Sequence, residues 1–395
     1  MKNIFLSLIC VLAITFCQAQ NKQYTIHGQV SGSCNGMKVL LQTTDYPAKT
    51  IDSAIIKNNQ FVMNGQIPAP GLYTWVIDRT PAGKESSERN WLSGKFYLEN
   101  SDITFKGDIQ TLPTYFWNPD RKGKAIIEGS ASEDLHQAFR KSIAPLSKKS
   151  SQLFEEYLEK YHRPSSKGIF NTQEGIRLAR EMTALDQQIG QATLDFIRQH
   201  PESVVAFDQA SYFLEGEVKL TAKQIDELSG ILSKVWANTP QLADFKSKAE
   251  KAKKIAIGVP YQDIELTNPE GQVVKLSQYI PKGKYVMLEF WASWCGPCRG
   301  EIPHLKHVYK AYKDKGFEII SVSIDAKDKD WKKAMQEENM DWIQLNDSKE
   351  FKGPAQQVYN VTGVPYCILL DKEGRIYKTN MRGAYLDAEL EKLIP

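Results

Sequence analysis

The feature that most constrains this chain is the stretch from Tyr285 to Cys298, where an apolar run ends at two cysteines separated by two residues. After the second cysteine, apolar residues recur at helical spacing, at Ile302, Leu305, Val308, Tyr309 and Tyr312. This pattern predicts a buried strand, a tight turn and a helix. We expect Cys295 where the helix begins, because unpaired backbone N–H groups and the helix dipole there favour a thiolate.

The two cysteines are spaced for thiol-disulfide exchange. Cys298 lies three residues after Cys295, so the two side chains share one helix face and are near enough to form a disulfide. The thiolate is the form that attacks disulfides. The spacing therefore predicts Cys295 as the nucleophile and Cys298 as the resolving thiol, and the two together as a redox-active disulfide.

Other interpretations of the cysteine pair fit the neighbouring residues less well. Covalent haem attachment needs a histidine directly after the second cysteine, where this chain has Arg299. A zinc site needs two more ligands, and His304 and His307 do not follow a common zinc-site spacing. Two structural cysteines that never pair are inconsistent with the exposed turn that Pro297 indicates at the helix start. We therefore expect no metal and no cofactor.

A single carboxylate interrupts the predicted strand. Glu289 lies in the middle of the run from Val286 to Trp291, which is apolar enough to be covered on both faces. A carboxylate is costly to bury, and burial raises its pKa. A buried acid with a raised pKa is typical of a functional site, and the alternative is an acid that reaches solvent at the sheet edge.

Residues 254–395 resemble the thioredoxin superfamily, and specifically the extracytoplasmic TlpA/ResA-like thiol-disulfide oxidoreductases. The resemblance rests on Trp294-Cys-Gly-Pro-Cys298, on Pro303 and on Val364-Pro365. It implies that Pro303 kinks the active-site helix and that Pro365 is a cis-proline packed against the disulfide, where it helps to bind the substrate backbone. It also implies that Glu289 carries a proton for the resolving cysteine. The residues that we expect to contact the substrate are Trp294, Gly296, Pro297, Val364 and Pro365.

The rest of the chain is predicted to contain two further structural regions. Residues 20–122 are β-rich and resemble the N-terminal β domain of unassigned function that precedes many thioredoxin-like modules in Bacteroidetes. Residues 123–253 have helical periodicity, with Thr221 and Gln224 spaced as a capping box. The expected fold class is therefore multidomain, with an N-terminal β-rich domain, a central α-helical segment and a C-terminal α/β thioredoxin-like fold at residues 254–395.

Residues 1–19 are typical of a cleaved signal peptide. Lys2 precedes an apolar stretch from Ile4 to Phe16, and the following Cys17-Gln-Ala19 resembles a small-x-small cleavage site. The apolar stretch is short for a membrane span, so no stable membrane insertion is expected. Lipidation of Cys17 is a less consistent alternative, because Phe16 stands where lipoprotein signals carry a small residue. We expect the mature protein in the periplasm or cell envelope.

The charge composition of the chain does not indicate binding to nucleic acid. Two cysteines, Cys34 and Cys367, lie outside the predicted redox pair. With 25% charged residues and a formal net charge of +3, the chain has no basic excess that would indicate nucleic-acid binding. Cys34 has no obvious partner and is expected to be incidental. Cys367 is expected to be a buried core thiol, and a third redox cysteine is the alternative.

These observations predict an exported thiol-disulfide oxidoreductase. The Gly-Pro dipeptide between the cysteines is that of thioredoxin, a reductant, so reduction of protein disulfides is favoured over oxidation. The expected partners are disulfide-containing protein substrates and a membrane thiol-disulfide electron donor. The resemblance suggests cytochrome c maturation or the rescue of oxidised envelope proteins as targets. The alternatives are a peroxiredoxin-like peroxidase and an envelope binding or assembly protein in which residues 20–253 hold a client.

Overall fold

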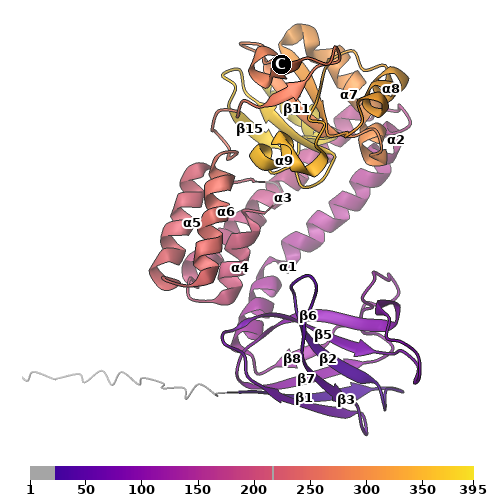
Figure 1. Ribbon diagram of the computed structural model, residues 1–395, viewed down its shortest axis with the longest axis vertical. Helices are drawn as coiled ribbons and strands as arrows, with labels where there is room; N and C mark the ends of the chain where they lie inside the picture. The colour runs from indigo at the N-terminus through magenta and orange to yellow at the C-terminus, as the bar shows by residue number, and fades with distance from the viewer. Residues whose placement is uncertain (1–22, 216–217) are drawn as a thin grey trace, which may run out of the picture. The chain divides into compact units, whose positions relative to one another are not determined.

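A computed structural model describes all of the chain except residues 1–22, 216 and 217 (Figure 1). The predicted signal peptide, with Cys17, lies outside the described residues. The chain divides into two compact units, one extending to Ala138 and the other running from Phe139 to Pro395. In the described part of the chain, no helix is long and apolar enough to cross a membrane.

The first unit contains two four-stranded sheets in its described residues. In spatial order, one sheet consists of β4 (Gln60–Gly65), β1 (Tyr24–Ser31), β7 (Asp102–Asp108) and β8 (Ile126–Glu128). The other consists of β3 (Thr50–Ile55), β2 (Lys38–Thr43), β5 (Gly71–Asp78) and β6 (Trp91–Leu98). The prediction of a β-rich N-terminal domain is confirmed.

The two sheets of the first unit share one apolar core. Along β1, alternate side chains are buried, as a strand with one covered face requires. Inward residues of both sheets meet, and the ring of Phe105 packs edge-on to that of Trp75 with centroids 5.3 Å apart. Cys34 is buried in this core, where its Sγ donates a hydrogen bond to the Val30 carbonyl oxygen at 3.2 Å. The unit is thus a β-sandwich.

The central part of the chain is helical, as predicted. Its helices are α1 (Ala131–Tyr157), the π-helical turn η2 (Leu158–His162), α2 (Arg163–Ser165), α3 (Thr172–Gln199), α4 (Val204–Tyr212), α5 (Ala222–Val235) and α6 (Pro240–Lys253). The capping box at the start of α5 is confirmed. The Thr221 Oγ1 accepts from the Gln224 N–H at 3.3 Å, and the Gln224 Oε1 accepts from the Thr221 N–H at 2.9 Å.

The C-terminal region is a mixed sheet with helices on both faces. In spatial order, its strands are β10 (Val273–Lys275), β9 (Glu265–Thr267), β13 (Ile343–Asn346), β12 (Phe317–Ser323), β11 (Tyr285–Trp291), β14 (Tyr366–Leu370) and β15 (Ile376–Thr379). The helices are α7 (Gly296–Tyr312), α8 (Asp328–Glu338), α9 (Pro354–Tyr359) and α10 (Ala384–Leu393). The thioredoxin-like α/β fold predicted here is confirmed, and β11 lies inside the sheet between β12 and β14.

The two faces of β11 contact different helices. Met287 packs in a core with Leu305 of α7 and Leu386 of α10. The ring of Phe290, which points to the opposite face because side chains alternate along a strand, contacts Tyr359 of α9 with centroids 5.5 Å apart. Because β11 is covered on both faces, any polar group within it is removed from water.

Helix α3 packs closely against α10 within the second unit. A Cβ placed on Gly175 of α3 would lie 2.2 Å from the Tyr161 ring and 2.8 Å from the Ala384 Cβ, so only glycine fits this contact. Ile176 and Ala388 belong to the same apolar cluster. Residues on either side of the predicted boundary at 253/254 therefore share a core, and the exact domain boundaries stay predictions.

Candidate active site

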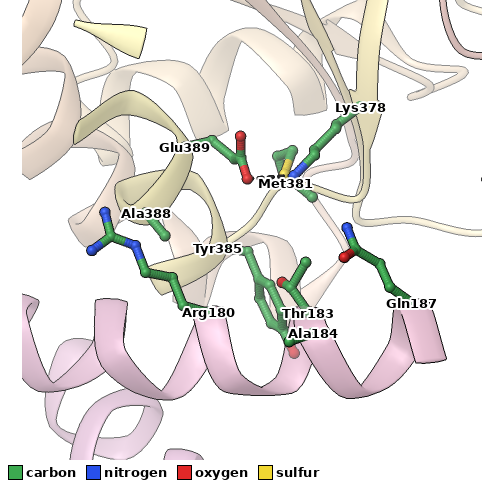
Figure 2. A pocket seen from close by; sticks show the side chains of 9 residues that line it. All are labelled: Arg180, Thr183, Ala184, Gln187, Lys378, Met381, Tyr385, Ala388 and Glu389. Carbon is green, nitrogen blue, oxygen red and sulfur yellow. Dashed lines mark hydrogen bonds and ion pairs between the residues drawn. The ribbon is translucent and has the colours of Figure 1, made fainter. Parts of the chain in front are cut away.

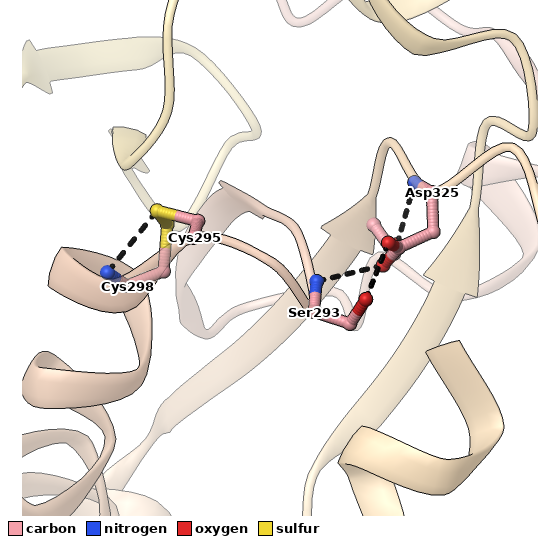
Figure 3. Close-up of a disulfide and its surroundings, with 5 residues drawn as sticks. Ser293, Cys295, Cys298 and Asp325 are labelled. Carbon is pink, nitrogen blue, oxygen red and sulfur yellow. Dashed lines mark hydrogen bonds between the residues drawn. A yellow bond between two sulfur atoms is a disulfide. The ribbon is translucent and has the colours of Figure 1, made fainter. Parts of the chain in front are cut away.

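The two predicted redox cysteines form a disulfide at the start of α7 (Figure 3). Cys295 is the N-cap of this helix, and its Sγ accepts a hydrogen bond from the Cys298 N–H at 3.2 Å. Cys298 is fully buried, whereas Cys295 retains 4% exposure. Cys295 is therefore the slightly more exposed of the two cysteines, and it lies at the helix N-terminus, where a thiolate is stabilised.

A buried aspartate holds the turn that leads into the cysteines (Figure 3). The Ser293 N–H and hydroxyl donate to the two carboxylate oxygens of Asp325, at 2.8 and 2.6 Å. Ser323, at the end of β12, donates to the same carboxylate at 2.7 Å. The sequence analysis did not single out Asp325; its position directly after a strand that is parallel to β11 was the available signal.

The predicted substrate-contacting residues differ in their surroundings. Trp294 is 59% exposed, and its ring contacts that of Phe351 with centroids 6.4 Å apart. A Cβ placed on Gly296 would have no described atom within 4 Å, so the space above it is open. Pro297 lies in the first turn of α7, at a position where its missing N–H costs no helical hydrogen bond.

Pro365 immediately precedes β14, the strand that pairs with β11, and β11 leads into the cysteine turn. The Val364–Pro365 peptide bond is cis, as the resemblance implied. The next residue, Tyr366, begins β14 and pairs with Phe290 near the carboxyl end of β11. The strand pairing therefore brings Pro365 to the end of the sheet from which the cysteine turn departs.

Glu289 is a buried acid in the middle of β11. It is 3% exposed, and it accepts a hydrogen bond from the Ser321 hydroxyl on β12. That hydroxyl accepts in turn from the Trp342 Nε1–H at 2.8 Å. Burial raises the pKa of Glu289 to about 7, the Ser321 hydrogen bond opposes this rise, and the negative charge of Glu301 adds to it. A carboxyl group with such a pKa can take up and release a proton near neutral pH.

Metal binding and a separate pocket were the two other features to place relative to the cysteines. Within the described residues, no group of three or more histidine, cysteine, aspartate or glutamate side chains is placed to hold a metal ion. A pocket between α3 and α10 is lined by Arg180, Tyr385 and Glu389 among others (Figure 2). None of the predicted site residues lines this pocket.

Two family models match the chain. Residues 257–379 match the AhpC/TSA family, and residues 24–136 match a domain of unknown function designated DUF4369. The first match contains all of the predicted site residues. The second covers the β-sandwich, consistent with the predicted N-terminal β domain.

Several known proteins are similar to the C-terminal region. The thiol-disulfide oxidoreductase ResA of Bacillus thuringiensis subsp. konkukian is 31% identical over 144 residues, which is 36% of this chain and 80% of that protein. ResA of Geobacillus kaustophilus is 30% identical over 138 residues, which is 35% of this chain and 76% of that protein. The thioredoxin domain of a thiol-disulfide oxidoreductase from Bacteroides vulgatus, a crystal structure, is 38% identical; the match covers 35% of this chain and 99% of that one, with a TM-score of 0.33.

Proposed function

Because the chain belongs, through its C-terminal region, to the thiol-disulfide oxidoreductases that include ResA, we propose that it is an exported disulfide reductase. The observation that carries the proposal is the Cys295–Cys298 disulfide at the N-terminus of α7, in which Cys295 is the N-cap residue and Cys298 lies inside the helix. A sulfur at a helix N-terminus suits a nucleophile, because its thiolate is stabilised there, and the second cysteine is then the resolving thiol.

The reaction proceeds by two exchanges of sulfur partners. The Cys295 thiolate attacks one sulfur of a substrate disulfide, which forms a mixed disulfide and releases the other substrate sulfur as a thiolate. Cys298 then gives its proton to Glu289, and its thiolate attacks the Cys295 sulfur. The substrate leaves as a second thiolate, and the Cys295–Cys298 disulfide forms. Two electrons have passed from the protein to its substrate.

The substrate is a protein disulfide bound across the end of the sheet. The exposed Trp294 offers an apolar surface beside Cys295, and the open space above Gly296 leaves room for a substrate chain. Pro297 lies in the first turn of α7, and Val364 and Pro365, at the same end of the sheet, contact the substrate backbone.

The cellular setting follows from the predicted signal peptide. After export through residues 1–19 to the periplasm or cell envelope, the oxidised pair needs thiols that an oxidising compartment does not supply. A membrane thiol-disulfide electron donor is therefore its reducing partner. Cytochrome c maturation and the repair of oxidised envelope proteins are the candidate processes.

Single cysteine variants of the mature chain test this function. In an assay that follows the reduction of an insulin disulfide by dithiothreitol, we expect Cys295→Ser and Cys298→Ser to lose activity. Only Cys298→Ser should accumulate a mixed disulfide with the substrate, because it retains the nucleophile and lacks the resolving thiol. Cys34→Ser, which alters a buried thiol of the β-sandwich, is the matched control and should retain activity. A mixed disulfide that forms on Cys298 instead would contradict the assignment.

A peroxidase assay distinguishes the alternative of a peroxiredoxin-like enzyme. The disulfide joins two cysteines only three residues apart on one helix, an arrangement suited to exchange with another disulfide. We expect the reduced protein to consume hydrogen peroxide no faster than a small dithiol does. Rapid consumption that depends on Cys295 would favour the peroxidase.

A further inference from the structure

Four aromatic residues form a surface at one end of the β-sandwich. Residues 113–115 pair antiparallel with the start of β6, where the Tyr115 N–H donates to the Trp91 carbonyl oxygen at 2.9 Å. The ring of Trp91 packs edge-on to that of Tyr115 with centroids 5.7 Å apart, and Tyr115 packs edge-on to Phe116 with centroids 5.1 Å apart. Trp117 follows directly in the chain. We call Trp91, Tyr115, Phe116 and Trp117 the aromatic tip.

The aromatic tip is turned toward solvent, unlike the rings of the sandwich core. The exposed fraction rises along the segment, from 45% at Tyr115 to 54% at Phe116 and 87% at Trp117. In the same sheet, Trp75 and Phe96 are only 5% and 3% exposed. Single exposed apolar side chains are common on protein surfaces, whereas a contiguous set of large rings marks a surface that binds something.

Specific hydrogen bonds hold the backbone beneath the tip. The Arg121 side chain donates its Nε–H to the Leu112 carbonyl oxygen at 2.8 Å and an Nη2–H to that of Ile109. The Gly123 N–H donates to the Thr111 carbonyl oxygen at 2.9 Å. A Cβ placed on Gly123 would lie 2.4 Å from the Thr111 Oγ1, so only glycine fits this contact. The loop is thus closed at its base, and the outward position of its rings belongs to the folded state.

Basic side chains lie in and beside the loop that carries the aromatic tip. Arg121 begins the run Arg-Lys-Gly-Lys, in which Lys122 and Lys124 are exposed. Burial lowers the pKa of Arg79, directly after β5, and the nearby positive charge of Arg121 lowers it further. Among the described residues, no acidic side chain forms an ion pair with any of these four. Residues 79–91 and 113–125 contain six Lys and Arg against three Asp and Glu, so the surface around the tip is net positive.

We propose that the aromatic tip is the contact through which the β-sandwich binds an anionic phospholipid surface. Tryptophan and tyrosine rings favour the boundary between lipid headgroups and hydrocarbon, because their apolar body and their polar N–H or O–H are both accommodated there. Lysine and arginine side chains beside them are attracted to anionic headgroups. The aromatic tip and the residues from Arg121 to Lys124 supply both interactions from one loop. The contact is peripheral and reversible, because the loop has too few apolar residues to cross a bilayer.

The exposure of the rings and the charge beside them favour a lipid surface over a folded partner. A ring that is 87% exposed, as that of Trp117 is, protrudes from its own chain. A protein partner needs a matching cavity to receive it, whereas a layer of lipid headgroups rearranges around it. The inference goes beyond disulfide exchange. It assigns the β-sandwich the role of holding the chain at a membrane surface, where the proposed electron donor is embedded.

Sedimentation with lipid vesicles tests the inference on residues 20–395, because the predicted signal peptide would itself bind lipid. We expect this chain to bind vesicles of phosphatidylcholine and phosphatidylglycerol, and to bind phosphatidylcholine alone about tenfold more weakly. The double variant Phe116→Ala, Trp117→Ala should lose about tenfold in affinity for the anionic vesicles. Tyr46→Ala is the matched control and should bind as the unaltered chain does. It removes a fully exposed ring that follows the end of β2 farther from the aromatic tip.

The charged part of the surface is tested by a second variant. Lys122→Glu, Lys124→Glu reverses two exposed charges and should weaken binding to the anionic vesicles without changing binding to phosphatidylcholine alone. Added salt should weaken binding to the anionic vesicles in the unaltered chain, because it screens the attraction. Binding that responds neither to these substitutions nor to salt overturns the inference.

Other outcomes exclude a lipid surface or identify another occupant. Failure of the unaltered chain to bind anionic vesicles overturns the inference, and so does equal binding by the variant that lacks the Phe116 and Trp117 rings. Binding to insoluble peptidoglycan, or self-association, that needs these rings and occurs without vesicle binding also overturns it. That variant should still reduce insulin with dithiothreitol, since neither ring lies near the cysteines in the sequence or in the same compact unit. An unaltered chain that binds vesicles but reduces no disulfide would contradict the proposed function alone.

Discussion

The hydroxyl of Tyr161 donates a hydrogen bond to the carboxylate of Asp387, a residue 226 positions later in the chain. Both side chains are buried, and the tyrosine ring also lies edge-on to His304 with centroids 6.1 Å apart. The contact joins the central helical segment to the last helix of the thioredoxin-like region. The helical segment is thus part of the surroundings of the active-site helix.

Removing the Tyr161 hydroxyl should destabilise the second unit. Tyr161→Phe keeps the ring and leaves the buried Asp387 carboxylate without one donor, which should lower the free energy of unfolding by about 1.5 to 3 kcal/mol. Urea unfolding of the full chain measures this loss. Tyr212→Phe, which alters a tyrosine that is 75% exposed, is the control and should change stability little. Equal stability of the two variants would show that the hydroxyl contributes nothing.

The packing of α3 against α10 can be tested with two glycines of the same helix. Gly175→Ala introduces a methyl group against Tyr161 and Ala384, so it should lower the free energy of unfolding by about 1 to 3 kcal/mol. Gly190→Ala, where no described atom lies within 4 Å of the added carbon, should raise it by up to about 1 kcal/mol through helix propensity. Thermal unfolding of both variants tests whether the two substitutions change the stability in opposite directions. A stabilised Gly175→Ala would contradict the close contact.

His304 should give the fold a stability that depends on pH. Its pKa is about 10 in the folded chain and 6.5 ordinarily, so its stabilisation is fully present below about pH 6.5 and is lost as pH rises through 10. His304→Asn leaves two buried carboxylates without their cation and should cost about 3 to 5 kcal/mol near pH 6. The difference in the free energy of unfolding between the variant and the unaltered chain should become smaller toward pH 10. Urea unfolding at several pH values measures it.

The control for His304 lies one turn further along α7. His307 is exposed, and its ring stacks on Phe170 with centroids 4.3 Å apart. His307→Asn should therefore change the free energy of unfolding little. A His304→Asn variant whose loss of stability is the same at pH 6 and pH 10 would be inconsistent with a buried imidazolium.

Glu289→Gln should slow the resolving step and change its pH dependence. Only an ionised Glu289 can accept the Cys298 proton, so the rate of resolution in the unaltered chain should rise as pH increases through about 7. We expect a loss of about 10²-fold in the variant and no rise in that range. Single-turnover release of substrate thiol from the mixed disulfide gives the rate. If both proteins resolve the mixed disulfide at the same rate at every pH, Glu289 takes no part in the resolving step.

The reduction potential of the Cys295–Cys298 pair decides the direction of electron flow. A reductase should have a value near or below about −250 mV, as thioredoxin does, whereas a value above about −180 mV would indicate an oxidant or isomerase. The fluorescence of Trp294 in glutathione and dithiothreitol buffers measures the equilibrium between the disulfide and dithiol forms of the pair. Trp294 is exposed next to Cys295, so its emission should differ between the disulfide and dithiol forms.

The family and the fold of the C-terminal region were predictable from local sequence. The apolar run of β11, the cysteine pair and Pro297 lie within a few residues of one another, and the strand, turn and helix form where that pattern places them. The helix N-cap at Cys295 and the capping box of Thr221 likewise depend on neighbours three residues away. Backbone geometry relates such residues directly, so their arrangement can be derived before any tertiary contact is known.

The sequence by itself identified the two cysteines that form the disulfide, and only the tertiary structure decided what surrounds them. Asp325 contacts Ser293 across 32 positions, and Asp387 contacts His304 across 83. In the sequence His304 stood out only as a poor zinc ligand, and Tyr161 and Asp387 did not stand out. The charge of a buried group depends on which partners the fold brings within hydrogen-bonding distance and how much water it excludes. Neither quantity is encoded by spacing along the chain.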